Sequence, residues 1–106
     1  MSFPLFCITN RHLYSMPFLD QLDRILTLRP AGVILREKDL SLEEYVSLGR
    51  QVLEKCRRAG VPCWFHTFVE AALELEPEGI QLPMPVLRAL PHRWRQKFPG
   101  QVGASC

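Results

Sequence analysis

The sequence lacks the features that would indicate a membrane, a nucleic acid or a zinc site. Thirteen basic residues stand against eleven acidic ones, and a net charge of +2 is too small to argue for a polyanionic partner. The apolar runs are far too short to span a bilayer. No two of the four cysteines form a C-x2-C pair, and no histidine is placed to complete a zinc site. We therefore expect no nucleic-acid partner, no membrane partner and no metal of this kind.

The cysteines also bear on the cellular location. Cys7, Cys56, Cys63 and Cys106 are scattered, and the chain does not begin with a signal peptide. Scattered thiols of this kind predict a protein of the reducing cytoplasm. With 106 residues, 47% of them apolar and 23% charged, the chain is long enough for one small globular domain with a single core.

Short apolar runs alternate with helical periodicities along the whole chain. The predicted strands are the apolar runs, and they cover residues 3–9, 32–38, 61–65, 79–82 and 101–105. The predicted helices share an apolar stripe, and they cover residues 18–28, 42–58, 68–75 and 86–97. Ser41 and Glu44 form a capping-box pattern before the second helix, and Gly60 should end it. Pro91 should kink the last helix or divide it into two short pieces.

This alternation of strands and helices with short connections predicts an α/β fold with a parallel sheet. The unit repeats at about 25 to 30 residues, as in a TIM (βα)8 barrel of roughly 250 residues. Five strands and four helices would then be the N-terminal half of such a barrel, in one partial domain over residues 1–106. A half barrel leaves its first and last strands as edges. The chain is then a fragment of a longer protein, or two copies pair as a homo-oligomer, or the sheet stays open.

Two cations lie at the end of the second predicted strand. Alternation along an extended strand places Ile34, Arg36 and Lys38 on one face and Glu37 on the other. Two cations on one face are costly to bury without an anion. They could clamp a phosphate, because Arg forks onto two oxygens and Lys supplies a point charge. The alternative is a solvated strand end with an Arg–Glu or Lys–Asp ion pair.

Several segments, in this order and at this spacing, carry a resemblance to a known family. They are Ile8-Thr-Asn-Arg11, Arg36-Glu-Lys-Asp-Leu-Ser41, Gly60-Val-Pro62, Gly79-Ile-Gln-Leu-Pro83 and Gly103-Ala-Ser105. The Arg-Glu-Lys-Asp stretch is the most specific of them. With these segments the chain resembles the thiamine phosphate synthase/TenI family of (βα)8 barrels, which acts in thiamine biosynthesis. The resemblance covers nearly the whole chain, but only the first half of the family fold.

The resemblance implies an activity and a set of ligands. In the synthase branch, a hydroxymethylpyrimidine pyrophosphate loses pyrophosphate, and the nitrogen of a thiazole phosphate captures the carbocation-like centre. Such chemistry depends on neutralising the charge of the leaving group. Arg36 and Lys38 match the family's pyrophosphate ligands, and Ser105 matches the serine of its fifth strand. The candidate phosphate or substrate ligands all fall at or near the ends of predicted strands: Arg36, Lys38, Ser105, Thr67, Gln81 and Arg11.

The sequence also departs from the synthase pattern. Ile34 stands where the family has a glutamine that reads the pyrimidine. His66-Thr67 stands in place of an Asn-Asp pair whose Asp binds magnesium, and Met84-Pro85-Val86 stands where the second magnesium-binding Asp is found. A threonine or an apolar side chain cannot supply the anionic oxygen that magnesium prefers. We therefore expect neither magnesium nor another cofactor.

The TenI-type branch is closer, since it often reads Val-Gln-Leu-Pro where this chain has Ile80-Gln-Leu-Pro83. The activity of that branch is tautomerisation of a thiazole phosphate, which moves one proton and suits a histidine. Its catalytic histidine would fall one residue past Cys106. His66, at the mouth of the third strand, is then the candidate acid–base group, with a plain polar contact as the alternative. The resemblance predicts a protein that binds a phosphorylated thiazole or thiamine precursor. A non-catalytic phosphate-ligand regulator, or a remnant on the same scaffold, is the alternative.

Overall fold

A computed structural model describes residues 6–9 and 17–105, with Phe6 and Ser105 described by their backbone alone. Five parallel strands form one sheet, and their order in space is their order in the sequence. The strands are β1 (Phe6–Ile8), β2 (Gly32–Leu35), β3 (Cys63–His66), β4 (Gly79–Pro83) and β5 (Gln101–Ser105). The predicted α/β fold with parallel βα repeats is confirmed. Residues 3–5 of the first predicted strand lie outside the described residues.

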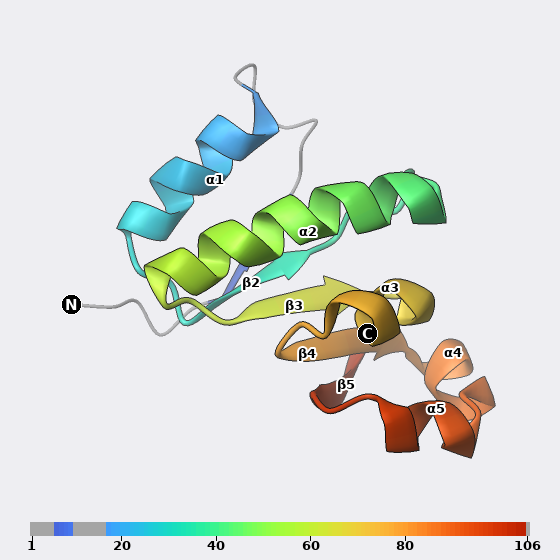
Figure 1. Cartoon of the computed structure of the whole chain (residues 1–106). Coiled ribbons are helices and arrows are strands. Elements are labelled where there is room, and N and C mark those ends of the chain that lie inside the picture. Colours follow the sequence, from blue (N-terminus) through green and yellow to red (C-terminus); the bar gives the residue numbers. More distant parts are fainter. Residues whose placement is uncertain (1–5, 10–16, 106) are drawn as a thin grey trace.

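One helix follows each of the first three strands and two follow β4, and Figure 1 shows α1 and α2 lying side by side over the sheet. Their bounds are α1 (Phe18–Thr27), α2 (Leu42–Ala59), α3 (Val69–Leu75), α4 (Met84–Ala89) and α5 (His92–Lys97). The predicted capping box of α2 is present. The Glu44 amide donates to Ser41 Oγ at 3.2 Å, and the Ser41 amide donates to Glu44 Oε1 at 3.0 Å. Gly60 follows α2 at a φ of 70°, which glycine adopts without steric penalty.

The single helix predicted over residues 86–97 is two helices in the structure. α4 begins at Met84, directly after β4, with Pro85 in its first turn, where the missing amide hydrogen costs nothing. The backbone is extended at Leu90, with a ψ of 122°, and α5 begins after Pro91. Because a proline disfavours the helical conformation of the residue before it, Pro91 ends α4. The prediction of two short pieces is therefore the correct one.

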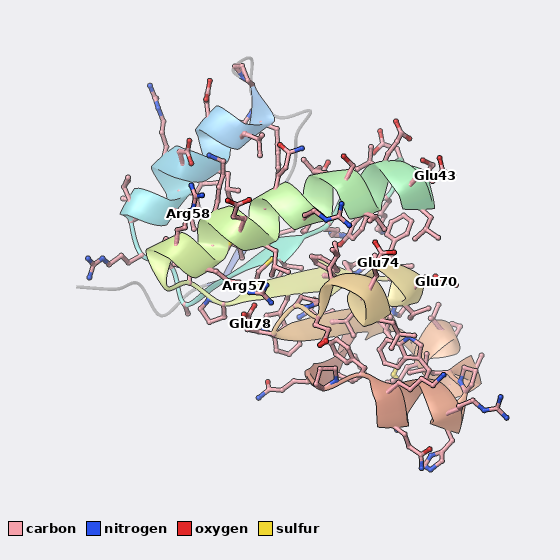
Figure 2. All side chains as sticks on the ribbon, in the orientation of Figure 1. Glu43, Arg57, Arg58, Glu70, Glu74 and Glu78 are labelled. Carbon is pink, nitrogen blue, oxygen red and sulfur yellow. The ribbon has the colours of Figure 1, made fainter. Side chains whose placement is uncertain are left out.

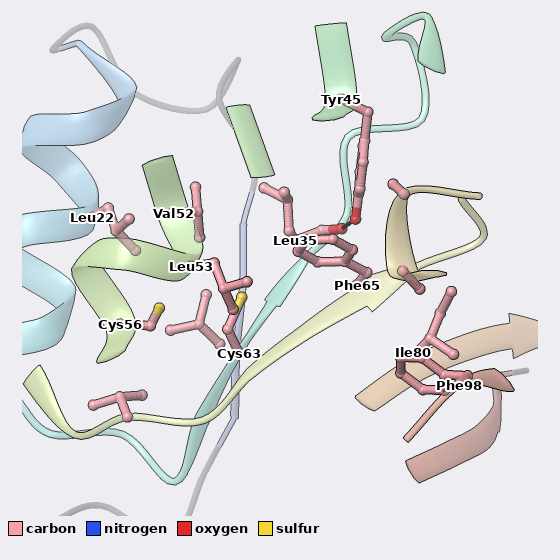
Figure 3. Close-up of a cluster of buried hydrophobic side chains, with 14 of the residues drawn as sticks. Leu22, Leu35, Tyr45, Val52, Leu53, Cys56, Cys63, Phe65, Ile80 and Phe98 are labelled. Carbon is pink, nitrogen blue, oxygen red and sulfur yellow. Dashed lines mark hydrogen bonds between the residues drawn. The ribbon is translucent and has the colours of Figure 1, made fainter. Parts of the chain in front are cut away.

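The hydrophobic core lies between one face of the sheet and the helices (Figure 3). On that face, Leu35 of β2 pairs with Phe65 of β3, which in turn pairs with Ile80 of β4, and all three are fully buried. Val52 and Cys56 of α2 pack against this face. Burying a side chain of this size is worth about 1.5–3 kcal/mol, so the core fixes which side of each strand faces the helices.

The alternate residues of each strand point to the opposite face. There Ile34, Trp64 and Gly79 are register partners on neighbouring strands, and His66 pairs with Gln81 one layer further along. A Cβ atom on Gly79 would lie 2.5 Å from Trp64 Cε2. The indole ring therefore packs directly on the backbone of β4, and it can do so only because residue 79 has no side chain.

Charged side chains lie on the outer surface of the helices (Figure 2). Arg58 Nη2 lies 2.6 Å from Glu54 Oε1, and Arg57 Nε lies 4.0 Å from Glu78 Oε1. All four side chains are exposed, so these pairs add little to stability. Among the described residues, no helix is both long and apolar enough to cross a membrane.

Candidate functional site

The carboxyl ends of the five parallel strands lie along one edge of the sheet, and most of the predicted ligands come from this edge. Arg36 directly follows β2, His66 ends β3, Gln81 lies in β4 and Ser105 ends β5. His66 and Gln81 are register partners. In barrels built from βα units, this edge is the one that carries binding and catalytic residues. We call the side chains of Arg36, Lys38, His66 and Gln81 the strand-end cluster.

The second strand is shorter than predicted, and this changes how its two cations are placed. β2 ends at Leu35, so the alternation of a strand does not reach Lys38, which lies in a turn. Arg36 and Lys38 are both exposed. Within the part of the chain that the structure describes, neither forms an ion pair with a carboxylate. Arg11, the remaining predicted cation, lies outside the described residues.

His66 is the buried member of the cluster, and its pKa responds to the other charges. The residue is only 6% exposed. Burial lowers the pKa of His66 below its ordinary value of 6.5, and the positive charges of Arg36 and Lys38 lower it further. The imidazole is therefore neutral at pH 7, and the positive charge of the cluster resides on Arg36 and Lys38. Because Arg36 and Lys38 both act on the pKa of His66, the three side chains belong to one interacting group.

Thr67 orients the His66 ring. Its Oγ1 lies 2.8 Å from His66 Nδ1, and the tautomer of the ring decides which atom donates. The Thr67 amide donates to the Gln81 carbonyl at 3.0 Å. Thr67 has a φ of 71°, which costs a β-branched residue about 1–3 kcal/mol and persists only where the surroundings impose it. Thr67, predicted as a substrate ligand, thus uses its hydroxyl on His66.

Three residues that support this edge were missed in the sequence. Thr9 Oγ1 accepts a hydrogen bond from the Arg36 amide at 3.0 Å and donates one to Glu37 Oε2 at 2.8 Å. The Tyr45 hydroxyl donates to the Leu35 carbonyl at 2.6 Å. The sequence held one signal for Tyr45, since a tyrosine in an apolar stripe must find a partner for its hydroxyl when it is buried.

The donors at the ends of β3 and β4 do not fit magnesium. The threonine hydroxyl at residue 67 is engaged with His66 Nδ1, and Met84 starts α4 directly after β4. Neither position offers a carboxylate, which is the usual protein ligand of this hard cation. Among the described residues there is also no group of three His, Cys, Asp or Glu side chains that could hold a metal ion.

Two surface hollows of the described structure lie away from the strand-end cluster. One is lined by Asp23, Lys55 and Arg58, between α1 and α2. Another is lined by Trp64 and Pro99, towards the amino ends of the strands. Neither is lined by a member of the strand-end cluster. What distinguishes this edge is a pair of exposed cations, Arg36 and Lys38, at the same strand ends as the buried His66.

Comparison with known proteins identifies the family. A family model described as "Thiamine monophosphate synthase" matches residues 5–106. The "Putative thiamine-phosphate synthase 2" of Aquifex aeolicus (strain VF5) is 33% identical over 79 residues, which are 74% of this chain and 42% of that protein. The thiamine phosphate pyrophosphorylase from Pyrococcus furiosus has the same fold, with a TM-score of 0.77 and 21% identity over 97% of this chain and 50% of that chain. This chain thus spans half or less of the length of these relatives. Because the family model matches almost every residue, the chain belongs to the thiamine monophosphate synthase family.

Proposed function

We propose that the strand-end cluster binds the phosphate group of a phosphorylated thiamine precursor, either a thiazole phosphate or thiamine phosphate. Family membership supports this substrate class. The observation that carries the proposal is placement: Arg36 and His66 directly follow the register partners Leu35 and Phe65, so the exposed cations Arg36 and Lys38 lie at the same edge as the buried His66. Two cations beside a neutral imidazole can hold a phosphate and still offer a hydrogen-bonding or proton-accepting nitrogen.

The proposal gives each side chain a role that suits its chemistry. Arg36 binds two phosphate oxygens with its planar guanidinium, and Lys38 adds a point charge. Gln81 is half-buried and in register with His66, so its amide can contact the heterocycle or the phosphate. Ser105 and Arg11 stay predictions from the family resemblance.

Proton transfer is the reaction we propose for His66. A thiazole phosphate tautomer becomes aromatic when a carbon-bound proton is removed and a proton is returned elsewhere. A neutral imidazole can accept that proton, and the contact of Nδ1 with Thr67 leaves Nε2 for the substrate. Since this chain spans half or less of its relatives, we assign it ligand binding and expect turnover only when the rest of the barrel is present.

A non-catalytic phosphate-ligand regulator, or a remnant on the same scaffold, is the second candidate. Thr67 and Met84 stand where the family resemblance places magnesium-binding carboxylates. Their absence argues against synthase chemistry and leaves ligand binding as a function that needs no turnover. A protein of this kind would bind the same ligands and would not convert them. Conversion of a thiazole phosphate tautomer by a protein that carries this chain would exclude it.

Isothermal titration with inorganic pyrophosphate, thiazole phosphate and thiamine phosphate tests the proposal. Loss of a charge-assisted contact costs about 1.5–3 kcal/mol, so Arg36→Ala should weaken binding about 10- to 100-fold. Arg95→Ala is the matched control, because Arg95 is an exposed arginine on α5. It should change the affinity less than about twofold. The proposal would be contradicted if none of the three ligands bound to the wild-type chain, or if Arg36→Ala and Arg95→Ala had the same affinity for them.

A further inference from the structure

Two side-chain hydroxyls hold the end of β2, at the point where Arg36 leaves the sheet. On the β1 side, the Arg36 amide donates to Thr9 Oγ1 at 3.0 Å, and the Thr9 amide donates to the Ile34 carbonyl at 3.0 Å. On the β3 side, the Tyr45 hydroxyl donates to the Leu35 carbonyl at 2.6 Å (Figure 3). The carbonyl and the amide of the Leu35–Arg36 peptide group are therefore each hydrogen-bonded to a side-chain hydroxyl, the carbonyl to Tyr45 and the amide to Thr9.

Tyr45 also joins β2 to β3. Its hydroxyl oxygen accepts the amide hydrogen of His66 at 3.1 Å while its own hydrogen goes to the Leu35 carbonyl. Leu35 pairs with Phe65 in the parallel ladder, so the Leu35 carbonyl and the His66 amide face each other across the two strands. The hydroxyl thus connects the residue before Arg36 with His66 itself.

Burial and two aromatic contacts fix the Tyr45 side chain in place. It is fully buried, its ring stacks on Phe68 with 4.2 Å between centroids, and it meets Phe65 edge-on at 5.3 Å. Burial raises the pKa of the Tyr45 hydroxyl above its ordinary value, so the group stays neutral and keeps its single hydrogen to donate. A rigid neutral hydroxyl can both donate and accept, which is what a link between two strands requires.

We propose that Tyr45 and Thr9 are positioning residues of the strand-end cluster. The Tyr45 hydroxyl sets the separation of the β2 and β3 ends, and the Thr9 hydroxyl holds the end of β2 against β1. Together they fix the spacing of Arg36 and His66 around a bound phosphate. The proposal rests on the proposed function for its ligand, whereas the spacing itself is a property of the free protein. Binding of an oxyanion needs its donors placed within a few tenths of an ångström, so a hydroxyl that touches no ligand can still control affinity.

Tyr45→Phe tests the proposal, because it keeps the aromatic ring and removes only the hydroxyl. Two quantities are measured: the NMR titration of the His66 imidazole in the free protein, and the Kd for inorganic pyrophosphate. Loss of one hydrogen-bonded link should raise that Kd about 3- to 10-fold and should move the His66 titration midpoint. Thr27→Val is the control, because it removes a hydroxyl that donates to the Arg24 carbonyl at 2.6 Å on exposed α1. A merely structural role would lower the melting temperature and leave the His66 titration in place.

The outcomes separate this proposal from the proposed function. If the wild-type chain binds none of pyrophosphate, thiazole phosphate and thiamine phosphate, the proposed function fails, and the His66 titration in the free protein still decides the role of Tyr45. If Tyr45→Phe does not fold, Thr9→Val removes the hydroxyl on the other side of β2, and it should raise the Kd and move the titration in the same way. An unchanged His66 titration and an unchanged Kd in a folded variant would overturn the proposal.

Discussion

Thr9 donates its hydroxyl hydrogen to the Glu37 carboxylate at 2.8 Å, and both residues are almost completely buried although 28 positions separate them in the sequence. The same hydroxyl accepts the amide hydrogen of Arg36. A carboxyl group taken out of water needs hydrogen-bond partners, and Thr9 provides one of them. This contact ties the strand-end cluster to β1.

Thr9→Val should be distinctly destabilising, because valine keeps the shape of threonine and leaves buried polar groups without these hydrogen bonds. We expect the free energy of unfolding to fall by about 1–3 kcal/mol, measured by urea denaturation. The control is Thr27→Val, whose hydroxyl is exposed, and it should lower the free energy by less than about 1 kcal/mol. Equal losses in the two variants would show that burial of the Thr9–Glu37 contact has no special importance.

The stability of the protein should depend on pH through His66. The pKa of His66 is lowered in the folded state, so the unfolded chain binds more protons as the pH falls below 6.5. The full stability is thus present above that pH and is lost as the pH falls through the folded-state pKa. Denaturation between about pH 5 and pH 8 should show this slope, and His66→Gln should reduce it.

The charge of Arg36 should be visible in the NMR titration of the His66 imidazole. Since Arg36 lowers the pKa of His66, Arg36→Ala should raise it, and bound pyrophosphate should raise it as well by neutralising the nearby cations. Arg95→Ala, on α5, should leave it unchanged. An imidazole titration midpoint at or above 6.5 in the free wild-type protein would contradict this account of the cluster.

Gly79→Ala should be destabilising even though its backbone can accommodate alanine. The new Cβ atom would lie 2.5–2.7 Å from three ring atoms of Trp64, and overpacking of this kind costs about 1–3 kcal/mol. Gly103→Ala is the matched control, because its Cβ would lie 3.6 Å from Trp64, an ordinary contact. Trp64→Leu should recover part of the loss in the Gly79→Ala background, and a purely additive double mutant would refute the steric explanation.

The two outer strands should promote association of the chain. In the described part of the sheet, β1 and β5 each pair on one side only, and Ile8 on β1 is 56% exposed. We expect light scattering after size exclusion to detect a concentration-dependent dimer, and Ile8→Lys to shift it towards monomer. Leu28→Lys is the control, because Leu28 is 55% exposed but lies at the end of α1. A wild-type chain that stays monomeric at high concentration would contradict the prediction.

Much of the fold could be predicted because its signals are local. Strands appear as short apolar runs, α2 has its capping box and its terminal glycine, and the alternation of elements implies a parallel sheet. The division of the last helical segment depended on Pro91, whose effect on its neighbours is also local. The second strand was predicted to reach residue 38, but β2 ends at Leu35. The charged residues 36–38 leave the ladder, although their sequence is compatible with an extended strand.

The sequence by itself determined which chemical groups reach the carboxyl ends of the strands, because parallel βα units always bring those ends to one edge. Arg36, Lys38 and His66 were therefore predicted from their positions near strand ends together with the family resemblance. Only the tertiary structure decided how they are held. Tyr45 belongs to the apolar stripe of α2, and nothing near it in the sequence connects its hydroxyl with residues 35 and 66. A buried hydroxyl bonds to whichever backbone groups the packing of a helix on a sheet brings within reach, and that packing is a property of the folded chain as a whole.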